Sequence, residues 1–236
     1  MKFLIILLLT TSICSCTQQW SCNETYAIQQ FKLKNSTGLF LNYTFNPYQN
    51  KDPAYIYDVE KNLLQNETYC GLRYTDSSKI NYELKTFESV DSLLENQFNI
   101  THKGKCGVCS TTQDLVVYLE KDLTQPVRWC GLRYFYSKKQ NIQCLLDLGF
   151  TYPCAQIWYY NTSNTRKQCG GICLLSYIFN QPFIVDGHLN KCLQCDEDKS
   201  GPIFKYESGR TRRDSGIESE IERPSDTIYN MDHCYY

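Results

Sequence analysis

The sequence is poor in residues that titrate near neutral pH and lacks an excess of charge of either sign. Its 236 residues include three histidines, His102, His188 and His233. A general base that works at neutral pH therefore has few candidates. The 24 Lys and Arg residues are balanced by 25 Asp and Glu residues. Such a chain lacks the overall basic character that nucleic-acid binding favours, and we expect no nucleic-acid partner.

Long apolar runs are also lacking after the first residues. A membrane-spanning helix needs about 20 apolar residues, and the run from Phe3 to Leu9 is much shorter. We therefore expect no transmembrane segment. A lysine before this run and small residues after it are typical of a secretory signal peptide. We predict a signal peptide over residues 1–16 and secretion through the secretory pathway. A lipoprotein anchor at Cys14 is the alternative, but Ile13 fits poorly before a lipidated cysteine.

Cysteine, by contrast, is abundant. Two of the fourteen cysteines, Cys14 and Cys16, fall in the predicted signal peptide and leave twelve in the mature chain. An even number after a signal peptide indicates a disulfide framework, whose pairing the sequence leaves open. The twelve disulfide candidates are Cys22, Cys70, Cys106, Cys109, Cys130, Cys144, Cys154, Cys169, Cys173, Cys192, Cys195 and Cys234.

Asparagine sequons mark expected surface positions and predict a glycoprotein. Secretion would expose them to glycosylation, which requires accessible backbone. A sixth sequon at Asn161 is doubtful because a helical face that we expect to be buried includes it. The five glycosylation candidates are Asn23, Asn35, Asn42, Asn66 and Asn99.

The N-terminal half has the patterns of a small sheet with helical cover. Alternating apolar residues predict strands over 38–45, 80–87 and 98–102. Helical spacing predicts short helices over 58–64 and 88–96. Together these segments favour strands interleaved with helices.

The C-terminal half has the patterns of several helices. Ser110 and Ser137 each precede a glutamine by three residues, a capping box that predicts a helix start. We expect the first helix to end at Pro126. A third helix should start near Pro153 and break at Gly170–Gly171. Its expected buried face consists of Cys154, Trp158, Asn161, Thr165 and Cys169.

These patterns predict an α+β fold class, with a small sheet in the N-terminal half and several disulfide-linked helices in the C-terminal half. We expect one disulfide-rich domain over residues 17–236. Residues 207–236 have few apolar side chains and should form an extended tail of this domain.

The sharpest chemical motif is Cys106-Gly107-Val108-Cys109, between a predicted strand and a predicted helix. A thiolate at a helix N-terminus is stabilised by the helix dipole, which makes Cys109 a candidate nucleophile. The motif resembles the redox pair of thioredoxin-like proteins. It is also similar to the C-G-S-C motif of papain-like peptidases, where the first cysteine is structural. Lys103 and Ser110 replace the glutamine and tryptophan of that motif. The peptidases also have a histidine and then an asparagine further along the chain; His188 and Asn190 occur in that order, but the residues around them do not resemble that motif.

Cys106 and Cys109 also have two structural interpretations, as disulfide cysteines or as zinc ligands. Cys106 and Cys109 are two of twelve cysteines, and in a secreted cysteine-rich chain a structural disulfide is the default. Zinc held by these two with Cys192 and Cys195 has the right spacing. An oxidising compartment disfavours it, so we expect no metal site and no cofactor.

Three arginines near the C-terminus form a second cluster, at Arg210, Arg212 and Arg213. They could form surface ion pairs with nearby carboxylates, which contribute little. They could instead bind an anion, because the guanidinium group suits phosphate, sulfate or carboxylate. The order Arg-Thr-Arg-Arg also matches the R-x-R-R pattern of proprotein processing.

Three motifs together resemble a known family. They are THxGxCGVCSxxQDL from Thr101, LNxCLQCDExxSGPxF from Leu189 and GRTRRxSG from Gly209. They are similar to a family of secreted, cysteine-rich proteins of microbial eukaryotes with no established activity. The resemblance runs from about Tyr82 to the C-terminus. It implies one domain and supplies no catalytic residues. A cysteine expected after Arg223-Pro224 is Ser225 here.

The sequence leaves two functions open. The first is a secreted or cell-surface interaction or structural module, which binds an extracellular protein or glycan through a tyrosine-rich surface. The second is a thiol-dependent enzyme, a cysteine hydrolase or a thiol-disulfide exchanger. Its catalytic candidates are Cys109 as nucleophile, Cys106 as redox partner, and His102 or His233 as base, with helix N–H groups as oxyanion donors.

Overall fold

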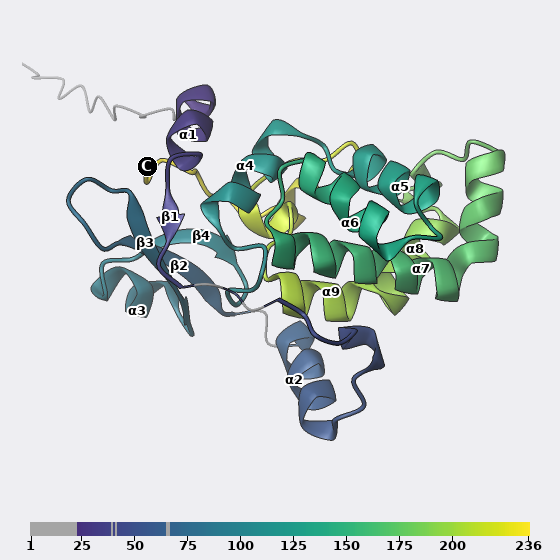
Figure 1. Ribbon diagram of the computed structural model, residues 1–236, viewed down its shortest axis with the longest axis horizontal. Helices are drawn as coiled ribbons and strands as arrows, with labels where there is room; N and C mark the ends of the chain where they lie inside the picture. Colours follow the sequence, from purple (N-terminus) through teal and green to yellow (C-terminus); the bar gives the residue numbers. More distant parts are fainter. Residues whose placement is uncertain (1–22, 39, 41, 65–66) are drawn as a thin grey trace, which may run out of the picture.

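The computed structural model describes residues 23–38, 40, 42–64 and 67–236 (Figure 1). The predicted signal peptide, Cys22 and Asn66 lie outside these residues. The helices are α1 (Glu24–Phe31), α2 (Pro53–Leu64), α3 (Val90–Glu95), α4 (Thr112–Glu120), α5 (Thr124–Arg133), α6 (Lys138–Asp147), α7 (Tyr152–Ile178), α8 (Lys191–Lys199) and α9 (Gly201–Ser208). The strands are β1 (Asn35–Ser36), β2 (Tyr69–Tyr74), β3 (Asn81–Phe87), β4 (Asn99–Lys103), β5 (Ile184–Val185) and β6 (His188–Leu189). Short 3-10 turns are η1 (Pro47–Gln49), η2 (Arg213–Ser215) and η3 (Ser225–Thr227).

The predicted α+β arrangement is confirmed. A four-stranded sheet in the order β1-β3-β2-β4 lies in the N-terminal half, and helices α4 to α9 make up the C-terminal half (Figure 1). Strand β2 is central and antiparallel to both β3 and β4. Gly71 lies in β2 where a Cβ atom would be 2.9 Å from Phe98 Cβ. The sheet therefore needs glycine at this position for Phe98 to pack against it.

The strand predicted over 38–45 is wrong. None of its described residues belongs to a strand. The backbone of Tyr43 instead bonds the side-chain amide of Gln156 in α7, through Tyr43 N–H to Oε1 at 2.9 Å and Nε2–H to Tyr43 O at 3.0 Å. A glutamine side chain thus occupies the place of a neighbouring strand and ties this segment to the helices.

The first helix of the C-terminal half starts one residue later than predicted. Thr111 is the N-cap of α4, and its Oγ1 accepts the N–H of Asp114 at 3.1 Å. Ser110 is engaged elsewhere, as described below. Pro126 does not end a helix but lies in the first turn of α5, where a backbone N–H has no intrahelical partner. Ser137 caps α6 as predicted.

Helix α7 runs for 27 residues and passes through Gly170–Gly171 without a break. Two disulfides hold this stretch against α8, Cys169–Cys195 and Cys173–Cys192, one on each side of the glycine pair. This anchoring offsets the roughly 1 kcal/mol by which each glycine weakens a helix. Cys154 and Cys169 are buried, as the predicted inner face required. Among the described residues, no helix is both long and apolar enough to cross a membrane.

The disulfide framework is confirmed and lies mostly in the helical half. The five pairs are Cys70–Cys106, Cys109–Cys154, Cys130–Cys144, Cys169–Cys195 and Cys173–Cys192. Cys234 is also disulfide-bonded. The five bridges join cysteines that are 14 to 45 positions apart. A native bridge that closes a loop of about this length stabilises a folded domain by about 3 kcal/mol.

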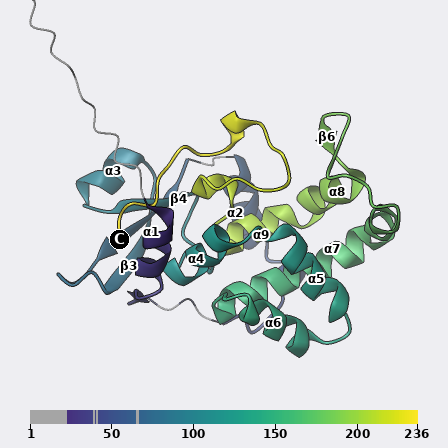
Figure 2. The same ribbon diagram turned by 90° about the horizontal axis from the view of Figure 1, so that it is seen from above.

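The last 28 residues contain only the 3-10 turns η2 and η3. They cross from the helical half to the sheet, and the C-terminus lies beside α1 (Figure 2). There Tyr235 packs 5.1 Å from Phe31, measured between ring centroids. We call residues 209–236 the C-terminal segment.

Candidate functional site

We call residues 104–111, between β4 and α4, the cysteine loop. This loop contains the Cys106–Cys109 motif, and it contacts the end of α9, where the motif that begins at Gly209 follows. The N–H groups of Val108 and Cys109 donate to the carbonyls of Glu207 and Ser208 at 3.0 and 2.9 Å. Gly107 and Gly209 are in backbone contact, and a Cβ on Gly209 would lie 2.4 Å from Gly107 N. We call the region formed by residues 101–110, 207–215 and 233–235 the motif junction.

Arg210 is the centre of the motif junction and is fully buried. All five of its N–H groups donate to neutral acceptors. Nε bonds Cys109 O at 3.0 Å, Nη1 bonds Thr101 O and Ser215 Oγ at 2.9 and 3.1 Å, and Nη2 bonds Thr101 Oγ1 and Ser110 O at 2.7 and 3.2 Å. Burial lowers the pKa of Arg210 from its ordinary value. The guanidinium thus joins β4, the cysteine loop and the C-terminal segment.

His102 and Ser110 form a second buried pair in the motif junction. His102 Nε2 lies 2.7 Å from Ser110 Oγ, and Nδ1 lies 2.9 Å from Lys103 O. A carbonyl can only accept, so Nδ1 carries the proton and Nε2 accepts from the serine hydroxyl. Burial, and then the charge of Arg210, lower the pKa of His102 well below its ordinary value. The pair has the geometry of a general base and a hydroxyl, but both residues have no solvent exposure.

His233 closes the motif junction from the C-terminal segment. Its Nε2 donates to Ser215 O at 2.9 Å, and its Nδ1 lies 3.1 Å from the hydroxyl of Tyr235. That hydroxyl is 2.8 Å from Thr101 Oγ1, which links it to Arg210. Burial, followed by the charge of Arg210, lowers the pKa of His233 to about 4. His102 and His233 are therefore both neutral in the folded protein at neutral pH.

The two cysteines of the motif do not pair with each other. Cys109 bonds Cys154 and is fully buried, and Cys106 bonds Cys70. A disulfide sulfur is not a thiolate. The Cys109 N–H, an expected oxyanion donor, is occupied by Ser208 O at 2.9 Å. The arrangement therefore lacks the free thiol and the free donor that the thiol-enzyme hypothesis requires.

The four cysteines of the zinc alternative belong to four different disulfides. Cys192 and Cys195 bond Cys173 and Cys169 of α7. A cysteine bonded to another cysteine offers no thiolate to a metal. Within the described ranges, no three His, Cys, Asp or Glu side chains are grouped so that they could hold a metal ion.

The three anion-binding candidates have different surroundings. Arg210 is buried with every donor occupied, which leaves none for an external anion. Arg212 donates to the carbonyls of Tyr118 and Lys121 at 2.7 Å and to Glu218 O. Arg213 is partly exposed and lines a surface pocket of about 200 Å³ together with Arg223 and Glu222. The burial of Arg210 also disfavours R-x-R-R processing of the folded protein, because Arg210 is the first arginine of that pattern and is inaccessible to a protease.

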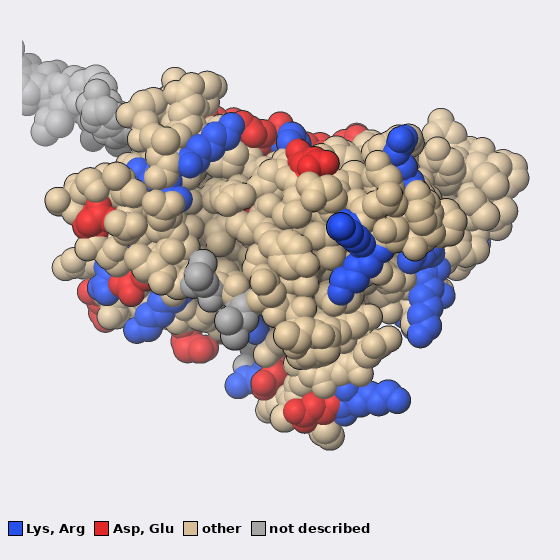
Figure 3. Space-filling view, viewed as in Figure 1, with Lys and Arg blue, Asp and Glu red and all other residues tan. Residues whose placement is uncertain are grey.

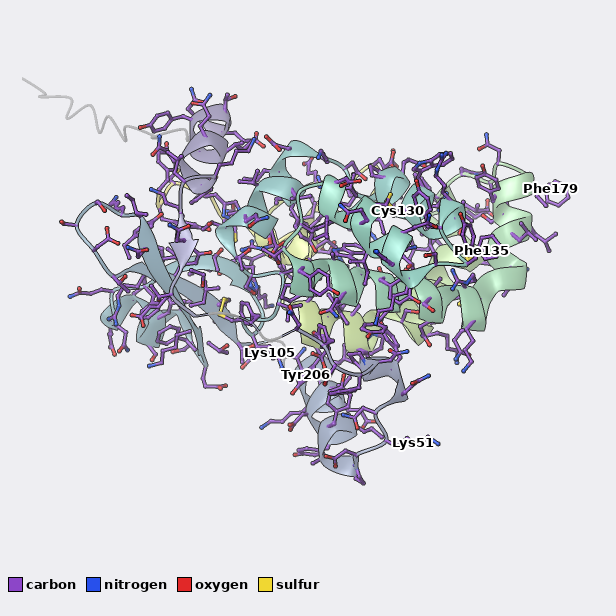
Figure 4. The ribbon with its side chains drawn as sticks, in the orientation of Figure 1. Lys51, Lys105, Cys130, Phe135, Phe179 and Tyr206 are labelled. Carbon is purple, nitrogen blue, oxygen red and sulfur yellow. A yellow bond between two sulfur atoms is a disulfide. The ribbon has the colours of Figure 1, made fainter. Side chains whose placement is uncertain are left out.

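An uncharged, exposed surface at the end of α7 was missed in the sequence analysis. We call it the apolar tip; its residues are 41–69% exposed and are Ile172, Leu174, Leu175, Tyr177, Ile178, Phe179 and Val185. Phe179 lies at the extremity of the molecule (Figure 4). The sequence signal was available, because Gln168 to Val185 contains no Lys, Arg, Asp or Glu. Such patches mark interaction surfaces in soluble proteins.

Four of the five glycosylation candidates lie within the described residues, Asn23, Asn35, Asn42 and Asn99, and all four are exposed. Asn161 is buried in α7, and its Oδ1 accepts the hydroxyl of Tyr48 at 2.9 Å. We therefore expect glycans at exposed sequons and none at Asn161. Peptide mapping after enzymatic deglycosylation in heavy-oxygen water checks this, since each occupied asparagine becomes a labelled aspartate. A label at position 161 would contradict the expected burial.

The chain matches a family of unknown function, DUF8771, over residues 138–231. The matched region begins at α6 and includes α7, the apolar tip, α8, α9 and most of the C-terminal segment. No curated protein and no solved structure matches the chain. The match agrees with the resemblance to an uncharacterised family and assigns no activity.

Proposed function

We propose that the protein is a secreted binding module, which its disulfides hold rigid and which binds through the apolar tip. The observation that carries this proposal is the exposure of Leu174, Leu175 and Ile178, at 56%, 55% and 62%. Burying a Leu or Ile side chain contributes roughly 1.5–3 kcal/mol. Covering these residues with a partner would therefore supply substantial binding free energy.

The tip owes its position to disulfides and not to a hydrophobic core. Cys173–Cys192 is the last bridge along α7, and none of the tip residues that follow it belongs to a hydrophobic core cluster of the described residues. Apolar side chains that neither fill a core nor face a described partner carry a solubility cost. A binding role accounts for that cost. The tip differs from the tyrosine-rich binding surface expected from the sequence, because six of its seven residues are not tyrosine; Tyr177 is 58% exposed within it.

Replacing Leu175 and Ile178 together with glutamate is expected to reduce binding of the labelled mature protein to cells of its source organism at least tenfold. The charged side chains would have to lose water when a partner covers the tip. Flow cytometry of cells incubated with labelled protein measures the effect. Leu33 and Leu64, at 63% and 87% exposure, provide a matched control when both are replaced by glutamate.

Mass spectrometry of unreduced, alkylated protein tests the competing thiol function in the same samples. We expect no rapid alkylation of Cys106 or Cys109 at pH 6, because both sulfurs are disulfide-bonded. Equal binding by the tip variant and its control would refute the proposal. A Cys109 that alkylates rapidly would restore the thiol-enzyme hypothesis.

A further inference from the structure

We propose that the apolar tip inserts into the surface of an anionic lipid bilayer, with the neighbouring basic side chains on the lipid headgroups. This inference rests on the proposed binding function and names the chemistry of its partner. Three features carry it: the shape of the tip, the charge of the helices behind it and the place of the acidic residues.

The shape of the tip suits a surrounding medium better than a protein groove. At about 100° per residue, the tip residues of α7 point over about 220° of the helix circumference. The remainder is occupied by Cys173, which bonds α8, and by the buried Ser176. A helix in a protein groove presents one apolar face. Both ribbon views place this end of α7 at the extremity opposite the sheet, where nothing else projects beyond it (Figures 1 and 2).

The helices behind the tip carry an excess of positive charge, although the whole chain has a net charge of −1. Between Thr124 and Lys191 there are seven Lys or Arg residues and two acidic residues, Asp147 and Asp186. The seven are Arg128, Arg133, Lys138, Lys139, Arg166, Lys167 and Lys191. Figure 3 shows an uncharged end with basic side chains beside it. Each basic residue near an anionic membrane contributes about 1 kcal/mol, so those beside the tip would strengthen its binding to the same surface.

The acidic residues of α8 are directed away from the tip by the disulfides. Cys192 bonds Cys173 and Cys195 bonds Cys169, so α8 runs antiparallel to α7. Lys191 is therefore the end of α8 nearest the tip, and Asp196 lies further back, where it accepts from the hydroxyl of Thr165. The arrangement keeps α8 carboxylates off a negatively charged surface.

Exposed aromatic side chains on α5 add the residues that favour the headgroup layer. Trp129 and Phe135 are 55% and 59% exposed. Arg128 lies 5.4 Å from the ring centroid of Phe183, so α5 adjoins the segment between α7 and β5. Tryptophan and tyrosine are enriched at membrane–water interfaces. A second copy of the chain is disfavoured as the occupant, because tip-to-tip contact would bring the basic side chains beside the tips of both copies together.

Sedimentation of the mature protein with lipid vesicles tests the proposal. We expect binding to phosphatidylcholine vesicles with about 30% phosphatidylserine, and much weaker binding to phosphatidylcholine alone or at high salt. The Leu175→Glu, Ile178→Glu variant should bind at least tenfold more weakly than wild type. The Leu33→Glu, Leu64→Glu control, which adds the same charge elsewhere, should bind like wild type. A Phe179→Trp variant should show a blue shift of its added emission when anionic vesicles are present.

Absence of vesicle binding, or equal binding by the tip variant and the control, would overturn the membrane inference. Analytical ultracentrifugation distinguishes a second copy: a dimer that the tip variant abolishes, without vesicle binding, would assign the tip to self-association. Loss of cell binding in the tip variant without vesicle binding would leave the proposed binding function standing, with a protein or glycan as its partner. Circular dichroism of every variant excludes misfolding as the cause.

Discussion

Replacing Arg210 with lysine is expected to lower the free energy of unfolding by about 3 kcal/mol. The guanidinium donates to five acceptors from three segments, at distances of 2.7 to 3.2 Å. Lysine has three donors on a single nitrogen and cannot reach acceptors on opposite sides. At least two buried acceptors would lose their partner, and a bond to a charged group contributes roughly 1.5–3 kcal/mol.

Thermal unfolding followed by circular dichroism measures this change, with an expected fall in Tm of roughly 6–12 °C for a chain of this size. Arg213→Lys is the matched control, because Arg213 is partly exposed in the same segment, and its effect should stay within about 0.5 kcal/mol. Similar Tm values for the two variants would show that the buried network adds little. Arg210→Ala removes all five donors, and we expect it not to accumulate as secreted protein.

Acidification from pH 6.5 to 4 is expected to destabilise the protein through its two buried histidines. Burial, with the charge of Arg210, lowers the pKa of His233 to about 4, so the folded protein keeps this side chain neutral while the unfolded chain protonates near pH 6.5. Its contribution is complete above pH 6.5 and is lost as the pH falls to about 4. The difference corresponds to about 3 kcal/mol. His102, whose pKa is also lowered, acts in the same direction.

Asp114 acts in the opposite direction and must be included. Burial raises the pKa of this carboxyl to about 6, although hydrogen bonds from Thr111 and Thr151 oppose the shift. It therefore binds its proton more tightly in the folded chain and adds stability as the pH falls from about 6 to 4. The stability that Asp114 adds offsets the stability lost through one histidine. The other histidine therefore makes the net change on acidification a loss of stability.

Urea unfolding at a series of pH values separates these contributions. His233→Gln, which retains a donor towards Ser215 O, should flatten the loss of stability between pH 6.5 and 4 by about 3 kcal/mol. Asp114→Asn should steepen that loss. His188→Gln is the control, because His188 is exposed. A wild-type stability that is constant from pH 6.5 to 4, with no change in the His233 variant, would rule out buried neutral histidines.

Local patterns predicted the elements whose stability is local. The alternation at 80–87 and the capping serine Ser137 led to the observed strand β3 and helix α6. The pentapeptide Cys-Gly-Leu-Arg-Tyr shows the limit of such patterns. At Cys70 it forms most of β2, and at Cys130 it lies in α5 and its C-cap. The surrounding sheet or helices, and not the five residues, determine the conformation.

Contacts between residues far apart in the chain determine the features that were predicted wrongly or could not be predicted from the sequence. Gly170–Gly171 looked like a helix break, and two disulfides to α8 keep the helix continuous there. Pairing among twelve cysteines cannot be deduced from spacing. The junction of Cys109 with Arg210 joins residues 101 positions apart, which no local pattern predicts. The apolar tip, in contrast, was readable in the sequence as 18 uncharged residues from Gln168 to Val185.

The position of Arg210 sets an order of events during synthesis. The side chain that joins β4 to the cysteine loop follows Thr101 by 109 positions and Cys109 by 101, so it is synthesised after both. Until the C-terminal segment is synthesised, the carbonyls of Thr101, Cys109 and Ser110 lack this donor, and β4 lacks its contacts with His233 and Tyr235. The helical half can oxidise its own bridges earlier, because both cysteines of Cys130–Cys144 and of Cys173–Cys192 lie close in sequence. We therefore expect the helical bridges to close while the sheet side still lacks these contacts, and we expect a chain truncated before Gly209 to remain in that partly folded state.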